Sequence, residues 1–576
     1  MNRLHRSFAA LAAFATFATA APAISENAPD PVGDWNGALH TPRGDLTLIV
    51  HVKKNAGGAL AATLESPDQG PGEMAASEVT ASSGHIAWKI ATIGASYQGD
   101  WDATQDAWVG TFSQGSDLPL ALKRGLPPAL PVVSGLDGRW EGTIAVNGAK
   151  LRLVARIATG ARGTAANLDS PDQLAYGMPL RNLTHDGQAV AFDLPAVKAH
   201  YTGTLSADGG KLTGTWTQPG FSAPVEFVRG DGAKAQAAAR PQTPKPPFPY
   251  QAEDVAFANP VQTQVHLAGT LTLPAGKGPF PAAVLITGSG PQDRDETLLG
   301  HKPFAVIADY LTRHGIAVLR FDDRGVGKST GNYGAATSAD LATDANAAAD
   351  YLLTRPEIRH DAIGFIGHSE GGMIGPIAMA SNDRIAFLIM LAGPGTALDK
   401  LMLSQRRLIG SQMGQSELQL DRAQPIMAAV FHAVAGAATP QAGREAARAV
   451  LTPAAMTMLG APGANPDLVL DQVTGPWFSY FLKYDPAPNL ARIKVPLLAL
   501  GGSLDRQVPA DENLPAIKAA TAGNPDVTIV ELPGLNHLFQ TAKTGAVGEY
   551  ADIEETVAPL ALRTMSDWLT KRFVKK

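Results

Sequence analysis

The chain has no cysteine among its 576 residues. Disulfide bonds, thiolate nucleophiles, cysteine metal sites and the lipidated cysteine of a lipoprotein are therefore excluded. Charge is also sparse: charged residues make up 17% of the chain, and 47 Lys and Arg stand against 53 Asp and Glu, for a formal net charge of −6. A mildly acidic chain without a basic stripe does not support binding to nucleic acid, so we expect no nucleic-acid partner.

Long apolar runs are missing too, apart from a short one at the N-terminus. Arg3 and Arg6 precede an apolar run from Phe8 to Ala18, and the small residues of Ala18-Thr19-Ala20 and Ala21-Pro22-Ala23 offer two cleavage sites. This pattern is typical of a secretory signal peptide, here residues 1–23. A membrane anchor is the alternative, but it needs about 20 apolar residues. We therefore expect an exported protein, periplasmic or secreted, that makes no membrane contact after cleavage.

Hydrophobic residues make up 45% of the chain, enough for several packed cores. Two successive regions, 28–126 and 131–230, alternate polar and apolar residues between turns, which is the pattern of short antiparallel strands. Five short sequences of the first region recur in the second at a nearly constant spacing of about 105 residues. The recurring pairs are Gly33-Asp-Trp35 and Gly138-Arg-Trp140, Ser66-Pro-Asp-Gln69 and Ser170-Pro-Asp-Gln173, Tyr97-Gln-Gly99 and Tyr201-Thr-Gly203, Gly110-Thr-Phe112 and Gly214-Thr-Trp216, and Lys123-Arg-Gly125 and Val228-Arg-Gly230. A constant spacing indicates a tandem duplication, so we predict two all-β domains, each a small barrel or sandwich.

Two features shared by the repeats admit two interpretations each. The repeated Trp and Tyr residues could line a cleft for a glycan, peptide or lipid, or they could fill the interior of each domain, and we favour the second. The repeated Ser-Pro-Asp-Gln sequence could be a polar site or a turn in which Pro fixes φ, and we favour the turn.

The rest of the chain has a different pattern. After an Ala- and Pro-rich linker at 231–250, strands and helices alternate from residue 251 to 576, which implies an α/β domain with a doubly wound, mostly parallel sheet. Ser338 is a suitable N-cap for one of the helices. The predicted strands are 265–273, 281–287, 316–321, 386–391, 496–500 and 527–532, with one more that ends at Gly367, and the predicted helices are 303–314, 338–355 and 557–572.

One stretch interrupts this alternation. Between Gly393 and about Pro488 no convincing strand is found, and helical periods cover 398–413 and 444–458. The loops expected within the stretch are 435–443 and 460–466. A helical insertion between two sheet strands predicts a cap over the active site, at about 395–488.

The sequence Gly367-His-Ser369-Glu-Gly371 has the form of a nucleophile elbow between a strand and a helix. Such a turn exposes the serine hydroxyl, and the two glycines let strand and helix approach without a Cβ clash. Gly327-Lys-Ser329-Thr-Gly331 has the same spacing, but five residues separate it from the preceding strand. Asp322 also occupies the position where a P-loop requires glycine, so we interpret Asp322 to Gly331 as a structural loop.

A nucleophile elbow of this kind is followed along the chain by an acid and then a histidine. Asp505 comes just after the strand at 496–500, and His537, the only histidine after the cap, comes just after the strand at 527–532. Asp511 is the alternative acid, but it lies near a helix start, where an acid complements the helix dipole. We predict that Ser369 attacks a carbonyl carbon, that His537 transfers the proton, and that Asp505 orients the imidazole.

The negative charge that develops on the substrate oxygen needs hydrogen-bond donors. We expect one from the backbone N–H of Glu370, directly after the nucleophile, and one from the loop Thr287 to Asp295. In that loop Ser289 is the first choice and Gly290 the second. The chemistry requires neither a cofactor nor a metal ion, and we expect none.

Several motifs of residues 251–576 occur together in one known family. They are Gly288-Ser-Gly-Pro-Gln-Asp-Arg-Asp-Glu296, Phe321-Asp-Asp-Arg-Gly-Val-Gly-Lys-Ser329, Gly367-His-Ser-Glu-Gly371, the loops of Asp505 and His537, and Trp477-Phe-Ser-Tyr-Phe481 with Tyr484-Asp-Pro486. On these motifs the region resembles the α/β-hydrolase superfamily, and more narrowly the bacterial carboxylesterases of the EstD type, which are often grouped with serine aminopeptidases and acyl-peptidases. The resemblance implies a serine carboxylesterase acting on small esters, and it leaves the N-terminal repeats unexplained.

The same resemblance leaves two alternatives open. One is a serine exopeptidase or acyl-aminoacyl peptidase that acts on short peptides, and such enzymes usually anchor the substrate's α-amine with paired acids. The cap acids Glu417, Asp421 and Glu445 include no adjacent pair, although helical spacing would let Glu417 and Asp421 share a face. The other is a hydrolase whose β-domains bind a glycan or a peptide.

Overall fold

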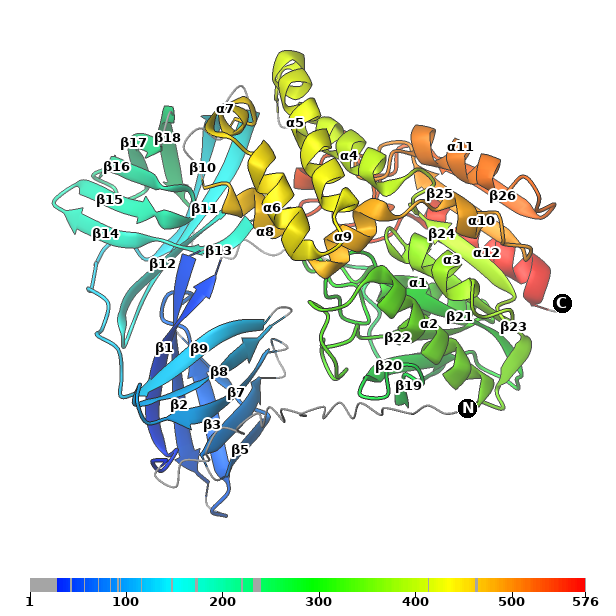
Figure 1. The fold of residues 1–576 in the computed structure, drawn as a ribbon, viewed down its shortest axis with the longest axis horizontal. Coiled ribbons are helices and arrows are strands. Elements are labelled where there is room, and N and C mark those ends of the chain that lie inside the picture. Colours follow the sequence, from blue (N-terminus) through cyan, green and yellow to red (C-terminus); the bar gives the residue numbers. More distant parts are fainter. Residues whose placement is uncertain are drawn as a thin grey trace, which may run out of the picture.

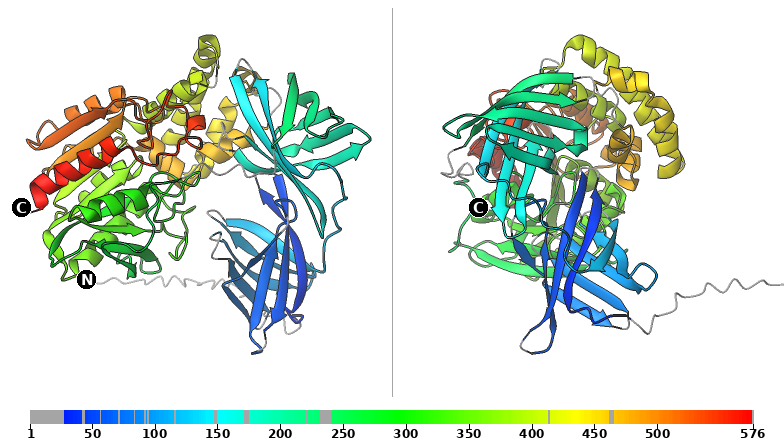
Figure 2. Two further views of the ribbon diagram at one scale, coloured as in Figure 1. Left: turned by 180° about the vertical axis from the view of Figure 1, so that it is seen from behind. Right: turned by 90° about the vertical axis from the view of Figure 1, so that its left-hand side faces the viewer.

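The computed structural model describes residues 28–574, except for 42–43, 56, 71, 83, 91–92, 94, 115–116, 147–148, 171–174, 219–220, 231–239, 413 and 461–464. The predicted signal peptide at 1–23 lies outside the described residues. Three sheets follow one another along the chain, and the two β-domains lie on one side of the C-terminal domain (Figures 1 and 2). Within the described ranges, no helix is long and apolar enough to cross a membrane.

The first β-domain is one antiparallel sheet in the order β4-β3-β2-β1-β9-β8-β7-β6-β5. Because β1 also pairs with β9, the sheet curls into a barrel that is interrupted between β4 and β5. Trp35, Trp88, Tyr97 and Trp108 pack together inside it and are each at most 2% exposed. The strands are β1 (Gly33–Thr41), β2 (Gly44–Lys54), β3 (Leu60–Glu65), β4 (Glu73–Ala75), β5 (Glu78–Ser82), β6 (His85–Ile90), β7 (Ala95–Asp102), β8 (Ala107–Ser113) and β9 (Asp117–Arg124).

The second β-domain repeats this topology, in the order β13-β12-β11-β10-β18-β17-β16-β15-β14. Trp140 and Tyr201 are fully buried in its core. The repeated aromatic residues therefore fill the barrels, as we favoured, and are not exposed for a ligand. The strands are β10 (Gly138–Val146), β11 (Ala149–Gly160), β12 (Gly163–Ser170), β13 (Ala175–Pro179), β14 (Arg181–Asp186), β15 (Ala189–Leu194), β16 (Ala199–Leu205), β17 (Lys211–Gln218) and β18 (Phe221–Arg229).

The first Ser-Pro-Asp-Gln sequence, at 66–69, is a turn closed by a hydrogen bond from Gln69 N–H to the Ser66 carbonyl at 2.9 Å. Its Asp68 is buried and forms an ion pair with Arg181 of the second β-domain at 2.8 Å. The turn therefore also joins the two barrels. Most of the second copy lies outside the described residues.

The third sheet has the order β19-β20-β22-β21-β23-β24-β25-β26. The first two strands are antiparallel to their neighbours, and the strands from β22 to β26 are parallel. The predicted fold class, two all-β domains before an α/β-hydrolase sheet, is confirmed, although β19 was not predicted. The strands are β19 (Gln251–Ala258), β20 (His266–Leu273), β21 (Phe280–Ile286), β22 (Ala317–Phe321), β23 (Ile358–His368), β24 (Phe387–Leu391), β25 (Leu497–Gly502) and β26 (Val527–Leu532).

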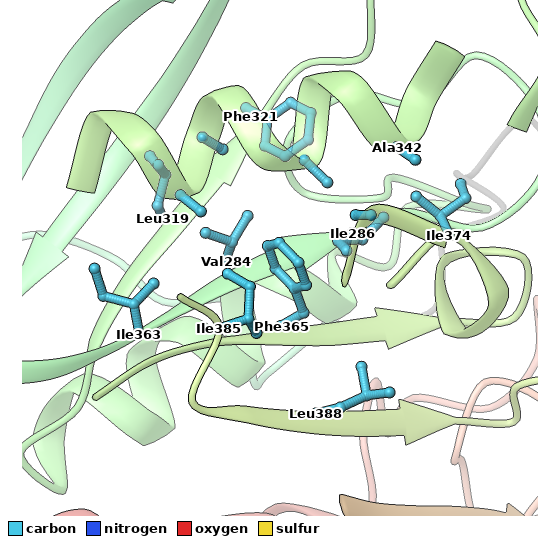
Figure 3. Close-up of a cluster of buried hydrophobic side chains, with 14 of the residues drawn as sticks. Val284, Ile286, Leu319, Phe321, Ala342, Ile363, Phe365, Ile374, Ile385 and Leu388 are labelled. Carbon is cyan, nitrogen blue, oxygen red and sulfur yellow. The ribbon is translucent and has the colours of Figure 1, made fainter. Parts of the chain in front are cut away.

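Helices cover both faces of this sheet. On one face, α2 (Ser338–Leu353), α3 (Gly371–Met379) and α11 (Ala510–Ala520) pack on a core that includes Val284 and Phe365 (Figure 3). On the other face, α1 (Pro303–Arg313) and α12 (Pro559–Phe573) cover a second core. Each large apolar side chain buried in this way contributes roughly 1.5–3 kcal/mol, which fixes the three-layer arrangement.

The helix α2 begins at Ser338, where the predicted helix begins, but its N-cap is the residue before. Thr337, not Ser338, is its N-cap, because Thr337 and Asp340 form a reciprocal capping box that Ser338 has no acid to form. The Ser338 hydroxyl instead donates to Glu370 at 2.6 Å.

The predicted all-helical cap is present between β24 and β25. The predicted helix at 444–458 is wrong as a single element, since Pro453 lacks an N–H and starts a new helix after the N-cap Thr452. The loop predicted at 435–443 is also too long, because helix continues to Gly436 and resumes at Pro440. The cap helices are α4 (Leu398–Gln412), α5 (Glu417–Gly436), α6 (Pro440–Val450), α7 (Pro453–Met458), α8 (Asp467–Val473), α9 (Pro476–Lys483) and α10 (Ala487–Leu490).

The described part of the linker, 240–250, forms neither helix nor strand and lies against the C-terminal domain. Arg240 donates to the carbonyls of Leu299 and Ala551 at 2.9 Å and of Ile553 at 3.0 Å. Gln242 Oε1 accepts from the N–H of Val557 at 3.0 Å. The linker is therefore docked on the segment that follows the His537 loop.

Candidate active site

The predicted nucleophile lies at the corner between β23 and α3. Ser369 has a φ of +52°, a left-handed conformation that is unfavourable for a residue with a Cβ and is typical of strained functional turns. Its N–H donates to the Leu391 carbonyl at 2.8 Å, which holds the corner against β24. A Cβ on Gly367 would lie 2.0 Å from the Gly371 carbonyl oxygen, so the close approach of strand and helix requires glycine.

The predicted acid and base meet in a buried hydrogen bond. His537 Nδ1 is 2.8 Å from Asp505 Oδ2, and the two side chains are 5% and 0% exposed. The other carboxylate oxygen of Asp505 accepts the N–H groups of Gln507 and Val508 at 2.8 and 2.9 Å, which fixes its orientation. With Nδ1–H donating to Asp505, the proton-accepting nitrogen of His537 is Nε2. Asp511 lies in the first turn of α11, as expected for the rejected alternative.

The strand ends bring this pair to the nucleophile elbow. Ser369, Asp505 and His537 follow β23, β25 and β26, whose carboxyl ends lie at the same edge of the parallel sheet. His368, which directly precedes Ser369, joins the elbow to the His537 loop. The Nε2 atom of His368 is 3.0 Å from the backbone oxygen of His537.

The two predicted oxyanion donors are both available. Within the described part of the chain, no acceptor bonds the backbone N–H of Ser289 or of Glu370. The N–H of Gly290, the second choice in the same loop, is already bound to the Tyr333 hydroxyl oxygen at 3.0 Å. A Cβ on Gly288 would lie 3.3 Å from Ser369 Cβ, so this loop lies directly against the nucleophile.

The loop that contains the second Gly-x-Ser-x-Gly match is structural, as predicted. Ser329 is 8% exposed, and its hydroxyl donates to the Asp322 carbonyl at 2.7 Å. Asp323, the residue after Asp322, is buried and accepts from Thr287 Oγ1 at 2.8 Å and from Gln292 N–H at 2.9 Å. The Asp322–Gly331 loop therefore supports the loop Thr287 to Asp295, which we call the oxyanion loop. Burial raises the pKa of Asp323 well above its usual value.

The side chain of Glu370 has a role that the sequence did not reveal. Its Oε1 accepts from Ser338 Oγ at 2.6 Å and from Trp477 Nε1, on cap helix α9, at 2.7 Å. Burial raises the pKa of Glu370 despite hydrogen bonds from Ser338, Trp477 and Ser289 that favour ionisation. One carboxyl group thus ties the nucleophile elbow to the cap and to α2.

A separate cavity of about 610 Å³ lies between the second β-domain and the C-terminal domain, lined on the latter side by Leu299, Ala551 and Asp552. Most of its charged groups are paired with one another, for example Arg139 with Glu141 at 2.7 Å. Ser369 does not line it. In the described residues, no group of three or more His, Asp or Glu side chains is placed to hold a metal ion.

Parts of this chain are similar to known proteins. Residues 302–541 match the family described as serine aminopeptidase, S33. The chain is 28% identical over 273 residues to Esterase EstD of Thermotoga maritima, an alignment that covers 47% of this chain and 58% of that protein. Among solved structures, esterase Pf2001 of Pyrococcus furiosus has a TM-score of 0.36 at 17% identity, covering 59% of this chain and 100% of that one. Est1E of Butyrivibrio proteoclasticus, solved with ferulic acid, has a TM-score of 0.34 at 17% identity, covering 54% of this chain and 97% of that one.

Proposed function

Because its C-terminal domain is an α/β hydrolase of the serine aminopeptidase S33 type, similar to Esterase EstD, we propose that this chain is a serine carboxylesterase. The observation that supports this most directly is the strained Ser369 at the elbow beside a buried Asp505–His537 pair. The alignment with Esterase EstD spans just over half of that protein, so the substrate is part of the proposal.

The proposed reaction uses these groups in order. The Ser369 hydroxyl attacks the ester carbonyl carbon while His537 Nε2 takes its proton, and Asp505 stabilises the resulting imidazolium. The N–H groups of Ser289 and Glu370 bind the oxygen that becomes negative. His537 returns the proton to the departing alcohol, which leaves an acyl-enzyme at Ser369. Water, deprotonated by His537, then releases the acid.

The charges of the cap favour an ester over a substrate with a free α-amine. Glu417 and Asp421, the acids that could have formed an amine site, are 69% and 63% exposed and both bind Arg407 on the surface of the cap. Arg406, on the same helix α4, has a buried Nη1 atom that lacks a hydrogen-bond partner in the described residues. Burial lowers the pKa of Arg406, and both acids are paired with Arg407, so neither is free to bind an ammonium group.

Purified protein should hydrolyse p-nitrophenyl acetate or butyrate, and Ser369→Ala should abolish this hydrolysis. Amino-acyl p-nitroanilides, assayed in parallel, test the exopeptidase alternative. Cleavage of the anilides without ester turnover would reverse the assignment, and full ester activity in Ser369→Ala would refute the proposed nucleophile.

We also propose that the protein is exported, on the strength of Arg3, Arg6 and the apolar run at 8–18. Cell fractionation followed by N-terminal sequencing of the purified protein tests this. A mature chain that begins after Ala20 or Ala23 is the expected result, and a chain that keeps the leader and remains in the cytoplasm would contradict it.

A further inference from the structure

A second buried charged pair lies directly beside the proposed acid–base pair. Glu296 Oε1 is 2.9 Å from His368 Nδ1, and the two side chains are 7% and 9% exposed. The other ring nitrogen of His368 is 3.0 Å from the backbone oxygen of His537. The imidazole rings of His368 and His537 have centroids 5.0 Å apart. The proposed reaction moves no proton through Glu296 or His368, so the presence of this pair needs another explanation.

The partners of His368 determine its protonation. One partner is a carboxylate oxygen and the other a carbonyl oxygen, and neither can donate a hydrogen bond. His368 therefore donates from both ring nitrogens, which makes it an imidazolium. Burial lowers the pKa of His368, but the charge and hydrogen bond of Glu296 outweigh this effect and raise the pKa overall.

The same carboxylate oxygen also holds the oxyanion loop. Glu296 Oε1 accepts the N–H of Gly288 at 2.7 Å, and Gly288 directly precedes the proposed donor Ser289. Glu296 has a φ of +52°, so the backbone adopts a left-handed conformation at the residue that carries this carboxylate. One oxygen thus joins the oxyanion loop to His368 at the elbow and, through His368, to the loop of His537.

We propose that Glu296 and His368 are positioning residues for the reaction. His368 holds the backbone of His537 so that the imidazole is placed against Ser369, and Glu296 holds Gly288 so that the Ser289 N–H faces the substrate oxygen. The pair acts through these groups and does not touch the substrate. The inference rests on the roles proposed for Ser369 and His537.

The variants Glu296→Gln and His368→Gln test the proposal by steady-state kinetics on p-nitrophenyl butyrate. Displacement of a base and a donor by a fraction of an ångström is expected to lower kcat by roughly 10–100-fold, because catalysis depends steeply on geometry. KM should change by less than about 3-fold, because the substrate still binds under an intact cap.

A control is Thr272→Val, which breaks another buried hydrogen bond of the same domain, between the hydroxyl oxygens of Thr272 and Thr312 at 2.7 Å, and these residues are 2% and 1% exposed. This variant should lower the melting temperature and leave kcat unchanged. If Thr272→Val loses as much kcat as Glu296→Gln, or if Glu296→Gln changes KM alone, the pair is merely structural and the proposal fails.

A measurement on the wild-type protein keeps the test decisive if these variants do not fold. With ¹⁵N-labelled histidine at pH 6, below the ordinary histidine pKa, a buried imidazolium gives two exchange-protected ring N–H signals, and their absence would overturn the proposal. The proposed function is tested separately by Ser369→Ala. Full activity in that variant refutes the function, whereas an inactive Ser369→Ala beside a fully active Glu296→Gln refutes only the positioning role.

Discussion

The buried carboxyl group of Glu370 provides a test of how this site is held together. Its Oε1 accepts from Ser338 and Trp477, and its Oε2 has no partner in the described residues. Since burial raises the pKa of Glu370, the carboxyl is neutral over part of the accessible pH range. Glutamine has nearly the shape of a neutral glutamic acid and keeps an oxygen for both donors. The substitution Glu370→Gln should therefore cost less than about 1 kcal/mol in mildly acidic solution.

The dependence on pH follows from the sign of the shift. A carboxyl whose folded pKa lies above its unfolded value of about 4.3 stabilises the fold fully below that value, and loses this contribution as pH rises through the folded pKa. One proton changes the free energy of unfolding by at most about 1.4 kcal/mol per pH unit. The stability of wild type relative to Glu370→Gln should thus fall with rising pH, with at most this slope.

The assay is unfolding in urea at pH values from 5 to 8. Unfolding is monitored by the loss of ester hydrolysis, which reports on the catalytic domain alone. Glu357→Gln is the control, because the hydrogen bond from Arg355 lowers the pKa of this surface carboxyl. Glu357 stabilises above the unfolded pKa and loses its effect only as pH falls below that value, so from pH 5 to pH 8 the stability of wild type relative to Glu357→Gln should stay nearly constant. If Glu370→Gln is destabilised by the same amount at every pH, Glu370 is ionised in the fold and the reasoning is refuted.

Three further substitutions have defined outcomes. Asp505→Asn should lower kcat by about 10⁴-fold with little change in melting temperature, and a loss below tenfold would contradict the assignment. The amide oxygen would stay on the N–H groups of Gln507 and Val508, so the amide NH2 would face Nδ1 and hold the imidazole in the wrong tautomer. Gly367→Ala should destabilise the catalytic domain by more than about 3 kcal/mol, because its Cβ would lie 2.0 Å from the Gly371 oxygen, and a normal melting temperature would show that the corner can relax. Arg240→Ala should speed hydrogen exchange in residues 547–557, since the carbonyls of Ala551 and Ile553 lose their donor, and unchanged exchange would mean that the linker only rests on the domain.

The central features of the site were predictable because they depend on chain order and strand ends. Ser369 lies between an apolar run and a helix, and Asp505 and His537 each follow a buried strand. In a parallel sheet these ends meet at one edge, so local sequence signals suffice to bring the three residues together. The tandem barrels were predictable for a similar reason, since a constant spacing of short motifs needs no knowledge of contacts.

What could not be predicted depends on contacts between distant segments. Glu296 and His368 are 72 positions apart and Glu370 and Trp477 107 apart, and no local pattern pairs them. Helix α5 was missed because its buried stripe is narrow and a proline lies inside it. The strand β19 was missed because its residues are mostly exposed. It lies at the edge of the sheet, where a strand has only one neighbour to impose a pattern on it.

The interruption of each barrel between its fourth and fifth strands has a consequence for the history of the chain. Because the first and last strands of a barrel are neighbours, the chain enters and leaves each barrel at adjacent points. A gene segment encoding one barrel could therefore be copied in tandem without rerouting any strand of the original. Copies of this kind can be gained or lost as cassettes, so relatives of this protein with one barrel or three would be topologically as sound as the pair seen here.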